Sequence, residues 1–525
     1  MKPVAENPNL IPSLLILSLG MVFCLLAIHQ PVGDYGNYYF GSKLALQPIS
    51  AGEIYEPWRF NELIRLQPGM QHEKFFLNYA PVPPFSLFFY VPFTLFPLFI
   101  SKLLFNLLSV LVFSASFSRL LAYYSIRSKL IWLLPFIFIL PLKSNIFSGQ
   151  SYLLMTAFLI EGFLADEKSR TWKASCWFAL AIALKIVPVF VLLYLLMRRK
   201  MKTFTFTVIS SLAFFLLGMC LAGWGSGVHY FTATLPRLFQ NEINNPYAVN
   251  YQSVFVFLKT VFVRDTLLNP ASPFDWPVCF EILQGTFTGL LFYVTVHVLY
   301  KSSGRLQAFS VALMFGLLAT AYSSTYSLFL LVIPAVALLN EKELPRRNGL
   351  TALLFLICLV PVYALAELPL PMRFLRLYAL LIFFIVFVIP SIKTVRWPWL
   401  FAFCFFFVSL RMSLAFFSEK DDSTYYLGRE EALLIRDYHW EGNRLMLDYV
   451  NEYGLSQKSL ACSDSVYPSP LLVLKNNQVF YNQKQITTGT DGKLKPALLN
   501  DSAIIYLSDK NRGVGFYTLR KKMLK

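Results

Sequence analysis

Residues 10–28 read LIPSLLILSLGMVFCLLAI, a run of apolar side chains that no charged residue interrupts. About 20 such residues are enough for a helix to cross the hydrocarbon core of a bilayer. Comparable runs follow one another along the chain. They lie near residues 10–30, 82–98, 100–122, 128–147, 150–166, 174–197, 203–222, 282–300, 305–322, 326–340, 349–367, 373–392 and 397–417. The sequence therefore predicts an all-α polytopic membrane protein with about 12–13 transmembrane helices.

The composition agrees with this class of protein. Of the 525 residues, 56% are hydrophobic and only 14% are charged, whereas soluble domains contain about 25% charged residues. The 46 Lys and Arg exceed the 29 Asp and Glu, which gives a net charge of +17. The basic clusters directly adjoin apolar runs, so we expect them to contact membrane lipid and not nucleic acid. The seven cysteines show neither the spacing of a zinc site nor that of a disulfide framework.

The basic residues between the runs predict the topology, because cytoplasmic loops are enriched in Lys and Arg. The basic links are near residues 119–129, 168–173, 198–202, 301–305, 342–347 and 393–396. We assign these links to the cytoplasm. The links near residues 34–80, 143–149, 223–281, 322–326 and 367–372 then lie on the outer face.

Successive links must alternate between the cytoplasm and the outer face. Two of the apolar runs therefore cannot be single membrane crossings. Residues 82–98 have prolines at both ends, and we expect them to form a juxtamembrane hairpin on the outer face. Residues 174–197 have basic residues at both ends, so we expect two crossings that turn at Lys185-Ile-Val-Pro188, where the proline breaks the helix. The result is 13 crossings with the N-terminus inside and the C-terminus outside.

The composition changes sharply after residue 417. We expect a transmembrane catalytic domain over residues 1–417, which includes an outer-face loop and hairpin over residues 34–98. Residues 418–525 should form a small extracytoplasmic α/β domain. Leu460-Ala-Cys462 and Ala503 to Leu507 are predicted strands, and Arg444 to Tyr453 is a predicted helix.

Asp34 is the first candidate for chemistry. It follows the first apolar run directly, within Gly33-Asp-Tyr-Gly-Asn-Tyr-Tyr39. A carboxylate among aromatic residues at the membrane interface is suited to act as a general base. The simpler interpretation is a residue at a helix exit that contacts water.

Other unusual polar residues fall on the same predicted face. Gly149-Gln150 begins a helix there, and the amide of Gln150 can hold a ligand rich in hydroxyl groups. Lys185 lies deep in an apolar run, where a phosphate or snorkelling to the headgroups would compensate its charge. Arg373 at the outer start of a later run can bind phosphate or anchor the helix. Asn250-Tyr-Gln252 precedes another apolar run, where Asn250 is also a candidate helix cap.

Several common site motifs are absent from the sequence. It contains no Walker A loop, GxSxG, HExxH or GxGxxG in a suitable context, and no Asp-x-Asp. We therefore expect neither a metal-dependent nucleotide-sugar site nor a cofactor.

The order of these pieces resembles the GT-C glycosyltransferases, and within them glycosyltransferase family 87. The matching order consists of Asp34 among tyrosines, Gly52-Glu-Ile-Tyr55, Tyr79-Ala-Pro81, Gly149-Gln150, Lys185-x-x-Pro188 and Asn250-x-Gln-Ser253. The resemblance covers roughly residues 10–340. Two positions depart from the family pattern: Tyr322 to Tyr326 contains no His, and Ser151 follows Gln150 where Asn is usual. The C-terminal tail has no counterpart in that pattern.

The resemblance implies an inverting glycosyltransferase of the bacterial inner membrane. Its donor would be a polyprenyl-phosphate-linked hexose such as mannose, and its acceptor a hydroxyl of a glycan, glycolipid or protein. By match, Asp34 is the general base. Lys185 and Arg373 would then bind the donor phosphate, and Tyr38, Tyr79, Gln150, Asn250 and Gln252 the sugar or acceptor.

Three other functions are compatible with parts of the sequence. A lipid-linked glycan flippase or transporter would place charged residues along a central path from both sides, but here the unusual polar residues gather on the outer face only. An O-antigen-type polymerase or ligase would carry paired arginines in a large outer loop, and residues 223–281 lack such a pair. A binding module on a membrane anchor would not need 13 crossings.

Overall fold

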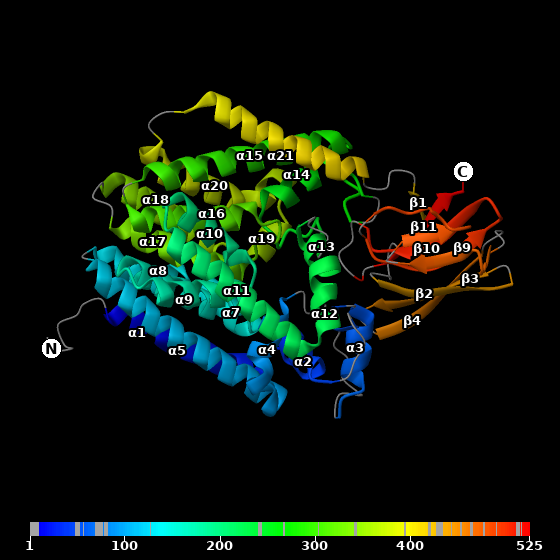
Figure 1. Ribbon diagram of the computed structural model, residues 1–525, viewed down its shortest axis with the longest axis horizontal. Helices are drawn as coiled ribbons and strands as arrows, with labels where there is room; N and C mark the ends of the chain where they lie inside the picture. Colours follow the sequence, from blue (N-terminus) through cyan, green and yellow to red (C-terminus); the bar gives the residue numbers. More distant parts are fainter. Residues whose placement is uncertain are drawn as a thin grey trace.

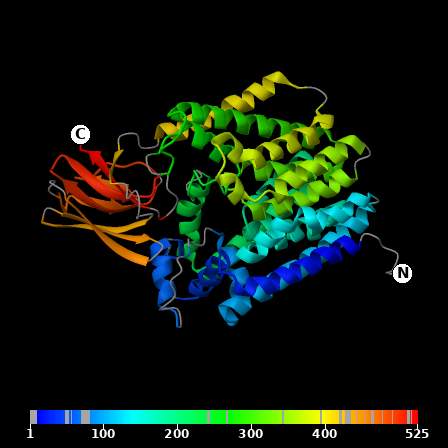
Figure 2. The ribbon, with the colours of Figure 1, turned by 180° about the vertical axis from the view of Figure 1, so that it is seen from behind.

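The computed structural model places a helical bundle and a group of β-sheets end to end. It describes residues 10–47, 53–55, 57–68, 77, 82–126, 128–239, 244–265, 268–302, 304–340, 344–392, 395–417, 422–426, 434–442, 444–451, 454–461, 466–475, 478–489, 491–510, 515 and 517–524. Figures 1 and 2 place the N-terminus and the β-sheets at opposite ends of the bundle. We call these two ends the N-terminal end and the β-sheet end.

Helices dominate the chain as far as Phe417. The α-helices are α1 (Leu10–Leu26), α2 (Tyr35–Ala45), α3 (Pro57–Arg65), α4 (Pro84–Tyr90), α5 (Leu98–Tyr124), α6 (Leu134–Ile137), α7 (Ile139–Ser148), α8 (Tyr152–Glu167), α9 (Thr171–Leu184), α10 (Phe190–Met197), α11 (Met201–Ala222), α12 (Trp224–His229), α13 (Leu235–Phe239), α14 (Val254–Phe262), α15 (Pro277–Lys301), α16 (Arg305–Ala319), α17 (Val332–Leu339), α18 (Leu344–Leu359), α19 (Val362–Ala366), α20 (Leu375–Val388) and α21 (Trp397–Phe417). In the described residues, seven helices are long and apolar enough to cross a membrane, and five shorter apolar helices accompany them. The predicted multi-pass helical fold with a small C-terminal domain is confirmed.

The predicted reversal between Lys185 and Pro188 is present. Lys185 Nζ lies 2.7 Å from Gln150 Oε1, just before α8 begins. At the other end of α8, Lys200 Nζ lies 3.4 Å from Asp166 Oδ1. Since Lys185 and Lys200 therefore lie at opposite ends of α8, α9 and α10 run in opposite directions. The turn between them contains Pro188, in the 3-10 helix η6 (Val187–Val189).

Residues 82–98 contain no long helix, as predicted for a hairpin. They form α4 and the 3-10 helix η4 (Val91–Leu95) before α5 starts. Helix α4 packs closely against α11 at Gly218, where an added Cβ would lie 2.2 Å from the backbone nitrogen of Phe85. This close backbone contact requires glycine at position 218.

The C-terminal region consists of antiparallel sheets. Its strands are β1 (Asp422–Tyr426), β2 (Leu434–Glu441), β3 (Arg444–Asn451), β4 (Gly454–Ala461), β5 (Val466–Tyr467), β6 (Leu472–Lys475), β7 (Gln478–Tyr481), β8 (Lys484–Gln485), β9 (Lys493–Leu499), β10 (Ala503–Ser508) and β11 (Thr518–Met523). One sheet has the order β1-β11-β10-β9-β5, and two three-stranded sheets have the orders β2-β3-β4 and β6-β7-β8. Strand β10 is buried on both faces, because Ile505 packs in one apolar cluster and Ile504 in another.

The predicted helix from Arg444 to Tyr453 is wrong, because residues Arg444–Asn451 form strand β3. Leu445, Leu447 and Tyr449 are buried at every second position, which is the period of a strand with one face in a core. The described part of this region is therefore β, not α/β. The predicted strands at Leu460-Ala461 and at Ala503 to Leu507 are confirmed as parts of β4 and β10.

The β-sheets are attached to the bundle through α13. Arg237 Nη2 lies 2.7 Å from Asp509 Oδ1, and the Asp509 side chain is fully buried. Asp509 also accepts hydrogen bonds from the backbone nitrogens of Gly492 and Gly515. Helices α3, α12 and α13 lie between the bundle and the sheets in both views (Figures 1 and 2).

A buried ion pair makes the stability of the β-sheets depend on pH. Asp491 Oδ1 lies 3.0 Å from Lys493 Nζ, and Ser508 Oγ donates to Asp491 Oδ2. Burial would raise the pKa of Asp491, but the Lys493 ammonium and the Ser508 hydroxyl outweigh it and hold the pKa below its ordinary value. A lowered carboxyl pKa contributes stability that is complete above the ordinary pKa of about 4 and is lost as the pH falls through the lowered one.

We therefore expect Asp491→Asn to destabilise the β-sheets at neutral pH by about 3 kcal/mol, because the buried Lys493 ammonium loses the carboxylate that neutralises its charge. The loss should shrink below about pH 4. The full chain in detergent is unfolded with denaturant at each pH, and proteolytic cleavage within the β-sheets reports the unfolded fraction. This measures the loss of stability at neutral pH and its decrease at low pH. The matched control is Asp501→Asn, which alters an exposed residue. Equal stability of Asp491→Asn and the unmodified chain at neutral pH would contradict the prediction.

Candidate active site

Asp34 lies at the start of α2, immediately after a tight turn. Gly33 has φ of +62°, and an added Cβ there would lie 3.2 Å from Ser148 Cα, so the turn is pressed against the end of α7. The carboxylate of Asp34 does not cap α2. Instead, Gln150 Nε2 donates a 2.7 Å hydrogen bond to Asp34 Oδ2. The carboxylate is therefore engaged by a distant part of the chain, which a simple helix-exit residue would not be.

Gln150 joins three other predicted site residues in one network. Its oxygen Oε1 accepts hydrogen bonds from Tyr38 Oη at 2.8 Å and from Lys185 Nζ at 2.7 Å. Its nitrogen Nε2 donates to Asp34. Because Gln150 is 5% exposed, the three contacts fix the orientation of the amide.

The backbone at Gly149 places Gln150 in this network. Gly149 ends α7 with φ of +66°, in the left-handed region that favours glycine. An added Cβ would lie 2.5 Å from the Cβ of Tyr35 on α2. Glycine is therefore required both by the turn and by the contact with α2.

We expect Gly149→Ala to lower any activity that depends on Gln150 by at least about 10-fold, since displacement of a site by 1 Å can cost about 100-fold. Gly223→Ala is the matched control: Gly223 also has positive φ, at +87°, but nothing lies within 4 Å of an added Cβ. The control should lose about 1–3 kcal/mol of stability through backbone strain alone. Turnover of the two variants is compared after both are shown to be folded. Equal turnover in Gly149→Ala and Gly223→Ala would contradict this prediction.

Lys185 lies in the break between α9 and η6. Its ammonium is 4.2 Å from the ring centroid of Tyr152 and 5.6 Å from that of Tyr326, which are cation–π distances. In the described residues, no carboxylate lies within ion-pair distance of Lys185 Nζ, although Asp34 is near enough to interact electrostatically. The ammonium is thus held by an amide and two aromatic rings, and its charge is not neutralised directly.

Aromatic rings surround the network. Tyr38 stacks on Tyr90 with centroids 4.7 Å apart and an interplanar angle of 7°. Tyr152 and Tyr326 lie 5.3 Å apart. Tyr326 and Tyr251 both interact electrostatically with Asp34. Tyr251 thereby connects the network with the loop before α14.

Gln252 and Arg373 form a second group next to this loop. Gln252 Nε2 donates to the backbone oxygen of Arg373 at 2.9 Å, while Arg373 Nε donates to the backbone oxygen of Leu368 at 2.7 Å. Gln252 is 7% exposed, and its buried Oε1 has no hydrogen-bond partner among the described residues. Asn250 is exposed, and Ser253, not Asn250, caps α14 by accepting from Val256 N at 3.2 Å. The remaining predicted residue, Tyr79, lies outside the described residues.

Sequence reasoning did not identify Tyr326 or Lys102 as neighbours of Asp34, or Tyr152 as a neighbour of Lys185. The two tyrosines come from α8 and from the 3-10 helix η8 (Thr325–Leu331), and nothing in their local sequence points to Asp34. Lys102 on α5 carried a usable signal, because a lysine inside an apolar crossing is unusual. It is 2% exposed and near enough to Asp34 to interact electrostatically.

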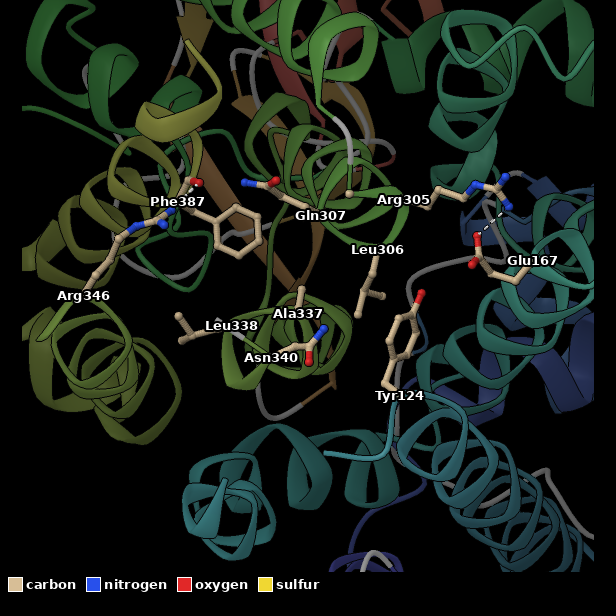
Figure 3. Close-up of a pocket in the computed structure, with 11 residues that line it drawn as sticks. Tyr124, Glu167, Arg305, Leu306, Gln307, Ala337, Leu338, Asn340, Arg346 and Phe387 are labelled. Atoms are coloured by element: carbon tan, nitrogen blue, oxygen red, sulfur yellow. Dashed lines mark hydrogen bonds and ion pairs between the residues drawn. The ribbon is translucent and has the colours of Figure 1, made fainter. Parts of the chain in front are cut away.

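A separate cavity of about 290 Å³ lies among helix ends, at residues we predict to be cytoplasmic. Figure 3 shows the guanidinium group of Arg305 turned toward Glu167 and that of Arg346 toward Phe387. Arg305 Nη1 lies 3.4 Å from Glu167 Oε1, and Arg346 donates to the backbone oxygens of Val386 and Phe387. These cations compensate a carboxylate and the C-terminal end of α20. We therefore place no sugar-phosphate site here.

Comparison with known proteins agrees with the resemblance seen in the motifs. Residues 82–324 match the model of glycosyltransferase family 87, so the predicted resemblance is confirmed. The match includes Gln150, Lys185 and Gln252. A polyprenol-phosphate-mannose-dependent alpha-(1-2)-phosphatidylinositol mannoside mannosyltransferase of Mycolicibacterium smegmatis is 32% identical over 99 residues. This alignment covers 19% of the present chain and 22% of that relative. No solved structure matches the chain.

Proposed function

We propose that this chain is an integral-membrane glycosyltransferase. It moves a sugar from a polyprenyl-phosphate donor to an acceptor hydroxyl at the β-sheet end of the bundle. The observation that carries the proposal is the network in which Gln150 joins the Asp34 carboxylate to the Lys185 ammonium. The match to glycosyltransferase family 87 supports the same class of reaction.

Asp34 is the general base of the proposed reaction. The Gln150 amide donates to Oδ2 and so orients the carboxylate toward an acceptor hydroxyl. As the acceptor oxygen attacks the anomeric carbon, its proton moves to Asp34. The bond from the anomeric carbon to the phosphate oxygen breaks, and its electron pair leaves with the phosphate. A single displacement of this kind inverts the anomeric configuration.

Cations stabilise the leaving group. Negative charge accumulates on the lipid phosphate as the glycosidic bond breaks, and a preorganised cation in a site that excludes water lowers the energy of that state. Lys185 is suited to this role because no carboxylate of the described residues pairs with it directly. Arg373 is the second phosphate ligand in the proposal, through the part of its guanidinium group that does not contact Leu368.

Buried polar atoms recognise the sugar. The Oε1 of Gln252, which has no hydrogen-bond partner within the described part of the chain, can accept a hydrogen bond from a sugar hydroxyl. The Tyr38 hydroxyl, which donates to Gln150, can also accept a hydrogen bond from a sugar hydroxyl. Tyr79 and the exposed Asn250 remain proposed contacts of the sugar or acceptor.

The proposed substrates follow from the resemblance and the curated relative. The name of that relative specifies polyprenol-phosphate-mannose as its donor, and we propose a hexose such as mannose for this chain too. The acceptor is a glycan, glycolipid or protein. We place the site and the β-sheets on the outer face of the membrane, as the distribution of basic links predicts. That this membrane is a bacterial inner membrane is what the family resemblance implies.

Transfer from defined donors tests this function. Full-length protein in lipid vesicles should move labelled mannose from polyprenyl-phosphate-mannose to lipids or glycans of a membrane extract. A nucleotide-linked mannose should give no product in vesicles that lack polyprenyl phosphate. Product formed directly from the nucleotide sugar would contradict the proposal, as would no transfer from a panel of polyprenyl-phosphate hexoses.

A further inference from the structure

Lys102 lies in the second turn of α5, where it links two separate segments of the chain. Its side chain is 2% exposed. The ammonium donates a 2.8 Å hydrogen bond to the backbone oxygen of Pro31 and a 2.6 Å bond to that of Phe147. Both acceptors are carbonyls, so these bonds provide no carboxylate to neutralise the positive charge.

The two carbonyls belong to the segments that lead into the active-site network. Pro31 precedes Asp34 by three residues, and Phe147 precedes Gln150 by three residues. The segments also touch directly where Gly33 approaches Ser148. Lys102 therefore ties together the backbones that carry the carboxylate and its amide partner.

Neighbouring groups on α5 strengthen the same connection. Asn106 Nδ2 donates to the backbone oxygen of Ile146 at 2.9 Å, and the hydroxyls of Ser101 and Tyr35 lie 2.5 Å apart. Each of these contacts joins α5 to one segment, whereas Lys102 joins it to both. Lys102 also differs from them in carrying a charge.

The charge of Lys102 needs an electrostatic explanation. An ammonium buried in a membrane-crossing helix is costly unless an anion or a polar cavity compensates it. In the part of the chain that the structure describes, no carboxylate lies within ion-pair distance of its nitrogen. Asp34 does interact with it electrostatically, as it does with Lys185. Asp34 is thus an acidic group that interacts with both Lys102 and Lys185.

We propose that Lys102 is a positioning residue that keeps Asp34 aligned with Gln150 for sugar transfer. This inference rests on the function proposed above. Lys102 acts on the reaction only through Asp34 and Gln150. It fixes the backbone on either side of the network and balances the charge of the carboxylate.

Lys102→Met tests the proposal, because methionine fills similar space without the charge or the hydrogen bonds. We expect kcat to fall about 10- to 100-fold, the scale of a small misplacement of catalytic groups, with KM for the donor within about 2-fold. Lys102→Arg should recover part of kcat. The matched control is Lys143→Met, which removes an exposed lysine from α7 and should leave kcat unchanged.

A double-mutant cycle distinguishes positioning from general destabilisation. If Lys102 acts through Asp34, adding Lys102→Met to Asp34→Asn should cost less than about 2-fold further. Thermal unfolding of each variant confirms that the compared proteins are folded. Full kcat in folded Lys102→Met, or losses that multiply in the double variant, would overturn the inference.

Hydrogen exchange gives a readout that does not need activity. Lys102→Met should speed amide exchange in residues 32–36 and 148–151, while α16, remote from the contact, keeps its protection. Unchanged exchange in both segments would overturn the positioning role even in an active transferase. If Lys102→Met speeds exchange but the unmodified protein transfers no sugar, Lys102 does join the two segments and the proposed function is wrong.

Discussion

Asp34→Asn should lower the rate of sugar transfer by about 10²- to 10⁴-fold while the protein remains folded. Asparagine has nearly the same shape as aspartate, and its amide oxygen can still accept the hydrogen bond from Gln150. The amide cannot take the proton of the acceptor hydroxyl, so the base is lost and the surrounding geometry is kept. The measurement is initial transfer from labelled polyprenyl-phosphate-mannose in vesicles, at matched protein content.

The control for this variant is Asp275→Asn, which alters an exposed carboxylate in the loop before α15. It should transfer sugar at the unmodified rate. Donor binding by folded Asp34→Asn should also persist, since Asp34 acts on the acceptor. If Asp34→Asn transfers sugar as fast as the unmodified chain, Asp34 is not the base.

Lys185→Met should lower kcat by about 10²- to 10³-fold, the typical cost of removing one group that stabilises transition-state charge. The variant removes the ammonium near Tyr152 and its hydrogen bond to Gln150. Because the phosphate gains negative charge only as the glycosidic bond breaks, kcat should fall more than donor affinity. Saturation kinetics with the polyprenyl-phosphate donor separate the two effects.

Lys185→Arg is the companion variant for this prediction. It preserves a positive charge and hydrogen-bond donors, so we expect it to recover part of kcat. The role of Lys185 would be contradicted if Lys185→Met raised the KM for the donor and left kcat unchanged. In that case the lysine would bind the donor equally in the ground state and the transition state.

Much of the helical fold could be predicted from the sequence, because apolar length and proline are local signals. The turn at Lys185 to Pro188 is an example, since basic residues at both ends of an apolar run required a reversal. The prediction of a helix from Arg444 to Tyr453 was wrong, although the apolar residues in this segment have the spacing of a strand. Leu445, Leu447 and Tyr449 alternate with more exposed side chains, and this period of two indicates a strand with one buried face.

The site was only partly predictable, for a physical reason. An unusual polar residue in an apolar setting is visible in the sequence, and Asp34, Gln150 and Lys185 were identified in this way. Their arrangement depends on contacts between distant segments. Gln150 reaches Asp34 only because α7 ends against α2 at Gly149. Asn250 shows that a motif alone does not place a residue in the site: it belongs to a recognisable motif, but its side chain is exposed.

The most direct test of the account is the anomeric configuration of the product. A polyprenyl-phosphate hexose of known configuration would be supplied to the full-length protein, and the linkage formed would be determined by NMR. With Asp34 as the base of a single displacement, the product has the configuration opposite to that of the donor. A product that retains the donor configuration would contradict the proposed mechanism.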